Sequence, residues 1–252
     1  AKGRSESAGR VLGTSIVQIF GIAAGLTGLS ESAARSAGFD AHSSIVLPSH
    51  HAGYYPDAQQ IRIKLVYDDA TGRVLGAQAV GRAGVDKRLD IIATVIHFGG
   101  TIDDLARLDL AYSPQYGSAK DPVHYAAFVA QNQREGLTPA IGPRLVPGDG
   151  YVLDVRSRDE FARGALAGSV NIPLDELRQR MEELPRDRQI AVLCQVGQRG
   201  HTAVRILRQH GFDAVNVKGG YRVAREMSGQ DRRRDGKDRQ LCPAVADSAR
   251  CG

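Results

Sequence analysis

One stretch of the chain places a cysteine between a short apolar run and an amphipathic segment. Residues 190–193 are uniformly apolar, which is typical of a buried parallel strand. Residues 201–210 carry apolar side chains at helical spacing and predict a helix. Because open α/β sheets gather functional groups where strands end, we expect Cys194 at such an edge. A strand–cysteine–helix unit of this kind requires a layered α/β fold around it.

The loop that joins these two elements has the composition of an anion and thiolate site. A helix N-terminus offers unpaired N–H groups and a partial positive charge, which lower the pKa of a nearby thiol. Gly197 lets the backbone turn its N–H groups inward, and Arg199 adds a fixed cation. Cys194 and Arg199 enclose four residues, a ring that suits one sulfur atom better than a phosphate. We predict Cys194 and Arg199 as catalytic residues. The residues predicted to form the persulfide- or anion-binding loop are Gln195, Val196, Gly197, Gln198 and Gly200.

Residues 151–227 resemble the rhodanese sulfurtransferases in four motifs that follow the family's order. These are Leu-Asp-Val-Arg at 153–156, Gly-Ser-Val-Asn-Ile-Pro at 168–173, Cys-x-x-Gly-x-Arg at 194–199 and Val-Lys-Gly-Gly at 217–220. The resemblance implies a parallel sheet with helices on both faces, and Asp154 and Arg156 are expected to support the loop. The pattern departs from the family at Ala165, where histidine is usual, and after Gly220, where Tyr221 replaces the expected tryptophan.

The first half of the chain shows a period of two, which predicts an antiparallel sheet with helices. Arg62 and Lys64 alternate with apolar residues, so one face of this sheet is expected to meet water or a partner. Ser30 is predicted to cap a helix that Gly38 ends, and Thr101 to open a short helix with a capping box. Strands are predicted at 13–20, 44–47, 61–67 and 74–80, and helices at 22–29, 30–37 and 87–98.

Three segments of this half resemble the C-terminal dimerisation domain of FAD-dependent pyridine nucleotide-disulfide oxidoreductases. They are residues 13–17, residues 51–56 and the segment 110–123, which contains Tyr-Ser-Pro-Gln-Tyr-Gly-Ser-Ala-Lys-Asp-Pro. The nearest branch is coenzyme A disulfide reductase, some of whose members carry a C-terminal rhodanese domain. The resemblance implies a homodimer in which tyrosines reach across to the partner's substrate. The matching positions here are Tyr54, Tyr55, Tyr112, Tyr116 and Lys120.

The two resemblances predict an α+β dimerisation domain followed by an α/β rhodanese-like domain. The predicted parts are a polar segment 1–12, the dimerisation-like domain 13–133, a Pro- and Gly-rich linker 134–150, the rhodanese-like domain 151–228 and a disordered tail 229–252. FAD and NAD(P)H are expected in the full-length family. Because no Gly-x-Gly-x-x-Gly follows a strand, we expect this chain alone to bind neither.

Composition narrows the partners and the compartment. The net charge is +5, yet no basic stripe with interleaved aromatic residues is present, so nucleic acid is not expected. Three cysteines in 252 residues do not form a disulfide framework, which favours a reducing, cytoplasmic location. An apolar run at 16–29 after basic residues imitates a secretory signal, but Gln18 and several glycines weaken it, and no membrane span is expected. The histidines show no metal-ligand spacing, so no metal is predicted.

The sequence therefore predicts a sulfurtransferase that carries sulfane sulfur as a persulfide on Cys194. The expected partners are an anionic donor, namely thiosulfate or a low-molecular-weight persulfide such as coenzyme A persulfide, and a thiol acceptor. Two alternatives stay open: a dimerisation and interaction module, and a partial flavin-dependent disulfide oxidoreductase. Cys242 and Cys251 are interpreted as exposed thiols of the tail, with a resolving role against Cys194 as the other possibility.

Overall fold

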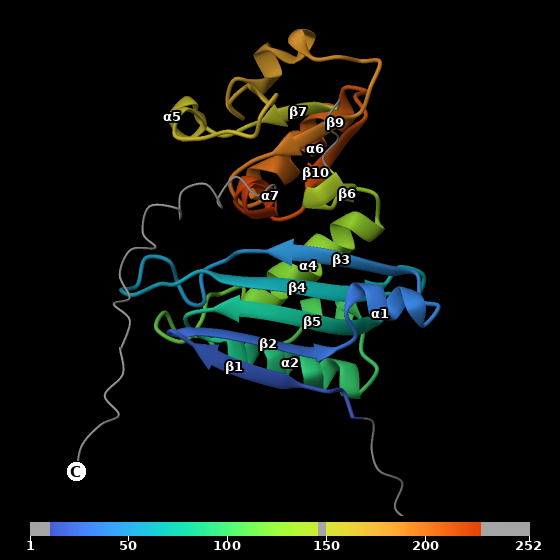
Figure 1. The fold of residues 1–252 in the computed structure, drawn as a ribbon, viewed down its shortest axis with the longest axis vertical. Helices are drawn as coiled ribbons and strands as arrows, with labels where there is room; N and C mark the ends of the chain where they lie inside the picture. Colours follow the sequence, from blue (N-terminus) through green and yellow to red (C-terminus); the bar gives the residue numbers. More distant parts are fainter. Residues whose placement is uncertain (1–10, 146–149, 228–252) are drawn as a thin grey trace, which may run out of the picture.

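Each half of the chain builds its own five-stranded sheet. Figure 1 shows the computed structural model, in which the two halves lie one above the other. The structure describes residues 11–145 and 150–227. The predicted tail, nearly all of the predicted segment 1–12 and part of the predicted linker lie outside the described residues. Within the described ranges, no helix has the length and apolar content needed to cross a bilayer. The domain boundaries themselves stay predictions.

The first sheet is antiparallel throughout, in the order β1-β2-β5-β4-β3. The buried residues of β4 and β5 pack against α2 and α4, which cover one face of the sheet. This confirms the predicted antiparallel sheet with helices, and Ser30 and Thr101 cap their helices as expected. The elements are β1 (Ser15–Ile19), β2 (Ile22–Gly28), α1 (Glu31–Ser36), β3 (Ala41–Val46), β4 (Ile61–Asp68), β5 (Val74–Gly81), α2 (Val85–His97), α3 (Ile102–Ala106) and α4 (Pro122–Arg134).

The helix predicted at 22–29 is wrong, because this segment is strand β2. Phe20 and Gly21 both adopt positive φ, 50° and 73°, and form a two-residue hairpin turn that folds β2 back on β1. A Cβ at Gly25 would lie 2.7 Å from the carbonyl oxygen of Ser15, so glycine here permits close backbone approach. Pairing with β1 and β5 decides the conformation, and local helical propensity cannot reveal those partners.

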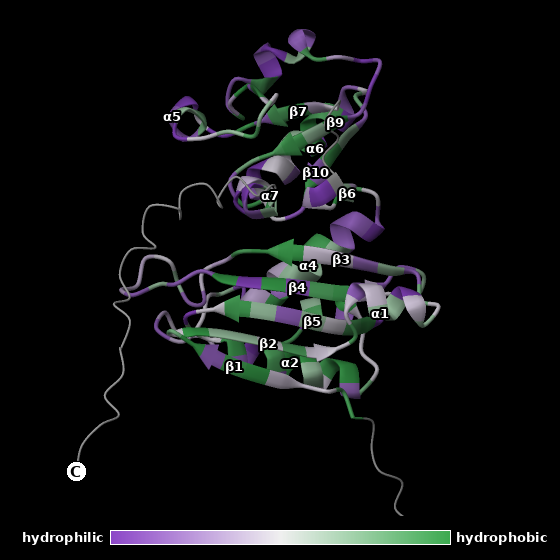
Figure 2. Cartoon of the chain, viewed as in Figure 1, coloured by the Kyte–Doolittle hydropathy of each residue, from purple (hydrophilic) through white to green (hydrophobic). Residues whose placement is uncertain are grey.

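The second sheet is parallel, in the order β6-β10-β9-β7-β8. One apolar cluster packs α6 on one face and a second packs α7 on the other, which confirms the predicted layers. Figure 2 shows β7 and β9, at the centre of this sheet, as hydrophobic. The elements are β6 (Ala140–Ile141), β7 (Tyr151–Asp154), α5 (Arg158–Ala162), β8 (Val170–Asn171), β9 (Ile190–Leu193), α6 (Gln198–Gln209), β10 (Ala214–Val217) and α7 (Gly220–Met227), with short 3₁₀ helices η1 (Pro143–Leu145), η2 (Leu177–Gln179) and η3 (Met181–Glu183).

Residues 177–179 and 181–183 form the short 3₁₀ helices η2 and η3. One segment of the second half differs from expectation. Residues 140–141, inside the predicted linker, form β6 and pair with β10 at the sheet edge. The chain thus enters the second sheet before the Pro- and Gly-rich stretch ends. A two-residue strand has no periodicity of its own, so the sequence could not reveal it.

The two halves contact each other along β3 and β4. Arg62 on β4 makes a bidentate ion pair with Glu226 on α7, at 2.8 and 2.9 Å. Thr138 Oγ1 lies 2.6 Å from His201 Nδ1 on α6, and Gln60 is hydrogen-bonded to Arg222. The sheet face that was expected to meet water or a partner therefore meets the second half of the same chain at Arg62.

Candidate functional site

Cys194 lies directly after β9, at the carboxyl end of the parallel sheet, with 1% of its surface exposed. The backbone N–H of Gly197 donates a hydrogen bond to its Sγ, at 3.1 Å. Gly197 adopts φ +103° and is the N-cap of α6, so the helix begins at Gln198 and not at the predicted residue 201. The earlier start brings the helix N-terminus, with its unpaired backbone N–H groups, within one turn of the thiol.

A glycine pair on the far side of the loop sets the direction of its carbonyl groups. Tyr221 N–H donates to the carbonyl of Cys194 at 2.7 Å, and Arg222 N–H donates to that of Gln195 at 3.2 Å. Gly219 and Gly220 adopt positive φ, and a Cβ at Gly220 would clash with the Cys194 carbonyl oxygen. The first turn of α7 thus takes up two loop carbonyls, which keeps these negative dipole ends away from the sulfur.

Asn216 on β10 supports the loop from another side. Its Nδ2 donates to the carbonyl of Gly197 at 3.0 Å, while its Oδ1 is buried and has no hydrogen-bond partner within the described residues. A Cβ at Gly200 would clash with Oδ1 and lie 3.2 Å from Cγ. Glycine at position 200 therefore lets α6 approach β10 closely enough for Asn216 to hold Gly197.

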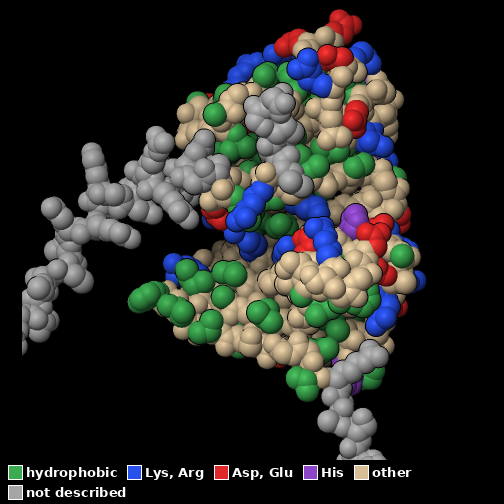
Figure 3. Space-filling model, turned by 45° about the vertical axis from the view of Figure 1, so that its right-hand side comes forward, with side chains coloured by type: hydrophobic (Ala, Val, Ile, Leu, Met, Phe, Trp, Pro, Cys, Tyr) green, Lys and Arg blue, Asp and Glu red, His purple; other side chains and the backbone are tan. Residues whose placement is uncertain are grey.

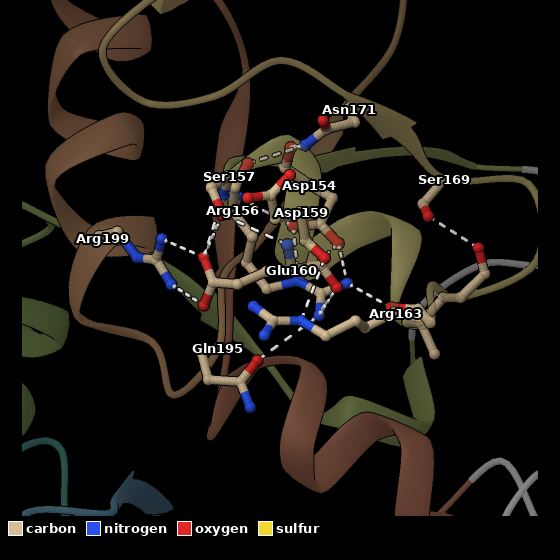
Figure 4. A network of polar contacts seen from close by, with 12 residues as sticks. Asp154, Arg156, Ser157, Asp159, Glu160, Arg163, Ser169, Asn171, Gln195 and Arg199 are labelled. Carbon is tan, nitrogen blue, oxygen red and sulfur yellow. Dashed lines mark hydrogen bonds and ion pairs between the residues drawn. The ribbon is translucent and has the colours of Figure 1, made fainter.

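Arg199 is fixed by Glu160, a residue that the sequence interpretation missed. The guanidinium makes a bidentate ion pair with the Glu160 carboxylate, at 2.7 and 2.8 Å. Glu160 also accepts hydrogen bonds from Ser157 in the capping box of α5, as Figure 4 shows. The Arg199 hydrogen bonds lower the pKa of Glu160 from its ordinary value of 4.5 to about 2. The Ser157-x-x-Glu160 spacing after β7 is the signal that could have identified it.

Asp154 and Arg156 form a buried ion pair beneath the loop. Arg156 Nη2 lies 2.7 Å from Asp154 Oδ2, and both side chains are almost wholly buried. Arg156 also donates to the carbonyl of Gly164 at 2.8 Å, reaches Gln195 Oε1 at 3.5 Å and stacks 3.8 Å from the centre of the Tyr221 ring. Tyr221 is itself buried and packs against Arg156, one of the two residues predicted to support the loop.

The predicted cross-dimer residues all lie in the first half, where two chain segments meet. Ala52 N–H donates to the carbonyl of Gly117 at 2.9 Å and joins these segments. Tyr54 Oη lies 3.3 Å from Tyr112 Oη, and the ammonium of Lys120 lies 5.6 Å from the centre of the Phe128 ring. The exposed tyrosines of this group are Tyr54, Tyr55, Tyr112 and Tyr116.

Strand β1 and the turn that follows it present an exposed apolar face. Phe20 is 95% exposed, and Ile16, Val17 and Ile19 are each more than half exposed. Large exposed apolar side chains of this kind are typical of interaction surfaces. Elsewhere, Asp40, His42 and Asp69 place ligand atoms within 4.8 Å of one another, but two of the three side chains are exposed and none belongs to the Cys194 site.

Comparison with known families assigns both halves. Residues 14–122 match the pyridine nucleotide-disulphide oxidoreductase dimerisation domain, and residues 143–225 match the rhodanese-like domain. The chain joins a dimerisation domain of this oxidoreductase type to a rhodanese-like domain. The β1–β5 sheet is thus the dimerisation domain, and the β6–β10 sheet with the Cys194 loop is the rhodanese-like domain.

Two solved structures resemble both domains together. The reduced "CoADR-RHD" of Bacillus anthracis is 41% identical, with a TM-score of 0.83, over 87% of this chain and 40% of that one. The NAD-dependent persulfide reductase from A. fulgidus is 42% identical, with a TM-score of 0.79, over the same shares. The second of these proteins is named as a persulfide reductase.

Curated relatives match through the first half. The NAD(P)H sulfur oxidoreductase (CoA-dependent) of Pyrococcus furiosus is 39% identical over 113 residues, 45% of this chain and 25% of that protein. The coenzyme A disulfide reductase of Staphylococcus epidermidis is 30% identical over 120 residues, 48% of this chain and 27% of that protein. The matched region therefore spans about a quarter of these curated relatives.

Replacing Glu160 with glutamine is expected to lower sulfur transfer about tenfold, because a charge-assisted pair that fixes Arg199 is lost. The loss should appear in kcat/KM for an anionic donor at pH 7. A depressed carboxyl pKa stabilises the folded state above pH 4.5, and this contribution is lost as the pH falls towards about 2. Urea unfolding of the wild type should therefore show a pH slope between these values that Glu160→Gln reduces. Equal slopes and equal kinetics would contradict this role for Glu160.

Proposed function

We propose that the chain accepts sulfane sulfur on Cys194 as a persulfide and passes it to a thiol. The observation that carries this proposal is the Gly197 N–H placed 3.1 Å from Sγ at the N-terminus of α6. A backbone donor there, with the helix dipole behind it, stabilises a sulfur anion in a buried site. Arg199, held by Glu160, adds a fixed cation at the same helix end.

The transfer is balanced without an external oxidant. The Cys194 thiolate attacks the outer sulfur of thiosulfate, the S–S bond of thiosulfate breaks, and sulfite leaves with the bonding electron pair. The outer sulfur then stays on Cys194 as a persulfide anion next to the loop N–H groups. An acceptor thiolate attacks that outer sulfur, and the bond to Cys194 breaks to regenerate the Cys194 thiolate. A low-molecular-weight persulfide can donate in the same way, with its thiolate as the leaving group.

The whole-protein context is also a proposal. The relatives' names include a coenzyme A disulfide reductase, a CoA-dependent NAD(P)H sulfur oxidoreductase and a persulfide reductase. We infer that the rhodanese-like domain handles sulfur for an FAD- and NAD(P)H-dependent reductase of this type, with coenzyme A persulfide among its donors. The exposed apolar face of β1 and Phe20 supports a homodimer formed through the dimerisation domain. The exposed Tyr54 and Tyr112 are then available to a partner subunit.

Intact mass after incubation with thiosulfate tests the sulfurtransferase. We expect a gain of about 32 Da, one sulfur atom, that a dithiol reductant removes, since the persulfide bond is exchangeable. Cys194→Ser should show no gain. The chain has two further cysteines, so a Cys242→Ser/Cys251→Ser double variant serves as the matched control and should gain the same mass as the wild type. A gain retained in Cys194→Ser, or absent from the wild type with Cys194 still alkylatable, would contradict the proposal.

A further inference from the structure

A cavity of about 570 Å³ lies between the dimerisation domain and the rhodanese-like domain. The end of the edge strand β3 and the chain that follows it, residues 45–49, line one side, together with part of α4. The dimerisation domain contributes an apolar wall with Ile45, Leu47, Phe128 and Val129. The rhodanese-like domain contributes a polar wall with Gln198, His201, Asn216 and Lys218. The volume falls within the range of small-molecule sites, which are concave, mostly apolar and carry a few polar groups.

Lys218 is the one lysine or arginine among the described residues that line this cavity, and it lies near a small charged group of the first half. Glu31 is the nearby carboxylate, and it already makes ion pairs with Arg35 and Lys64, each at 2.6 Å. Lys218 adds a third cation to this group and makes no ion pair with a carboxylate of residues 11–145 and 150–227. Its burial lowers the pKa of Lys218, and Glu31 opposes that effect. Figure 3 shows Lys and Arg side chains gathered at the hollow between the two halves.

Some residues that line this cavity also position the Cys194 loop. Gly197, whose N–H donates to Cys194 Sγ, lines the wall, and so does Asn216, which holds the Gly197 carbonyl. His201, on the first turns of α6, is tied to Thr138 of the interdomain segment. A molecule in the cavity would therefore contact Gly197, the residue whose N–H donates to the sulfur.

We propose that this interdomain cavity binds a small amphipathic organic anion, with its acidic group at Lys218 and its apolar body against Ile45, Phe128 and Val129. Charge complementarity selects the anion, because a partly buried ammonium without a paired carboxylate gains most from a bound counter-charge. Since the occupant contacts Gly197, its binding changes the reactivity of Cys194. The site adjoins the Cys194 loop, but binding there does not require sulfur transfer.

A pair of matched fluorescent probes tests the site on the full chain. Dansylglycine carries one carboxylate, and dansylglycinamide has the same body without the charge. We expect saturable binding of dansylglycine that is about tenfold tighter than that of the amide, the size of one charge-assisted contact. Lys218→Met keeps the apolar stem and should erase the difference between the probes. Lys87→Met, a partly exposed lysine on α2, is the matched control and should preserve it.

A cavity-filling variant and the rate of Cys194 alkylation test the site and its link to the loop separately. Val129→Trp fills the cavity from α4 and should abolish saturable binding, while probe adsorbed on the exposed β1 face should be unaffected. Saturating dansylglycine should change the rate of Cys194 alkylation by iodoacetamide about threefold or more in the Cys242→Ser/Cys251→Ser background. Absence of saturable binding, or a charge preference that survives in Lys218→Met, would overturn the site. An unchanged alkylation rate at saturation would overturn its link to the loop. Neither readout requires sulfur transfer, so failure here is distinguishable from failure of the proposed function.

Discussion

A Gly220→Ala variant will lose sulfur transfer by about 100-fold or more, although position 220 never contacts the reacting sulfur. A Cβ at this position would clash with the carbonyl oxygen of Cys194 and lie 2.8 Å from the backbone nitrogen of Val196. Both are backbone atoms, so the loop itself must move, and the Gly197 N–H then leaves its place at Sγ. The measurement is kcat/KM with thiosulfate and a thiol acceptor, together with the yield of persulfide by intact mass.

Gly211→Ala is the matched control for this variant. Gly211 also has positive φ, +81°, but a Cβ there would meet nothing within 4 Å. Alanine at 211 therefore carries only the cost of a left-handed conformation, about 1–2 kcal/mol, without displacing the loop. We expect Gly211→Ala to lower the melting temperature modestly and to retain sulfur transfer. Equal activity in the two variants would show that the Gly220 contact does not position the loop.

Replacing Arg156 with methionine will lower the free energy of unfolding by about 3–5 kcal/mol, because it leaves the Asp154 carboxylate buried without its partner. The pair is almost wholly buried, and the guanidinium also holds the carbonyl of Gly164 and stacks on Tyr221. Methionine fills part of the same volume, so the loss is mainly electrostatic. Urea unfolding at pH 7, followed by circular dichroism, measures the change.

The neighbouring Arg158 offers a control of the same residue type. Arg158 pairs with Glu176 at 2.7 Å, but its side chain is 70% exposed. Exposed ion pairs contribute about 0–1 kcal/mol to stability. The free energy of unfolding of Arg158→Met should therefore be close to that of the wild type. A second variant, Asp154→Leu with Arg156→Met, removes both charges and should recover part of the stability. Equal free energies of unfolding for Arg156→Met and Arg158→Met would show that the buried ion pair does not stabilise the fold.

The assignment of the dimerisation domain and the proposed function of the rhodanese-like domain rest on different residues. The dimerisation domain is assigned by its sheet and by residues 14–122, whereas the proposed sulfur transfer rests on the loop after β9. The alternative of an interaction module predicts no persulfide on Cys194, which the mass experiment tests. The alternative of a partial disulfide oxidoreductase is compatible with the proposed carrier, because the relatives named as reductases include a structure matched over both domains.

The local geometry around Cys194 was largely accessible from sequence. The apolar run before Cys194, Gly197 and the helix after it predicted a thiol at a helix N-terminus, and the structure has this arrangement. The caps at Ser30 and Thr101 were also predicted correctly, because a side chain three residues from its backbone partner is a local relation. The alternation of apolar and polar residues in β4 and β5 likewise predicted which face of the first sheet is buried.

The features that depend on partners distant in the chain required the tertiary structure. Glu160 and Arg199 are 39 positions apart and meet only because β7 and β9 are adjacent in the sheet. Strand β2 is decided by pairing with β1 and β5, against the predicted helix. The contact of Gly220 with the Cys194 carbonyl and the cavity at Lys218 arise from packing between elements and between domains. Sequence by itself determined where the thiol, the helix after it and the two caps lie, because strand, helix and cap signals are local. The tertiary structure decided what holds those groups in place, because long-range contacts depend on the sheet order and the domain interface.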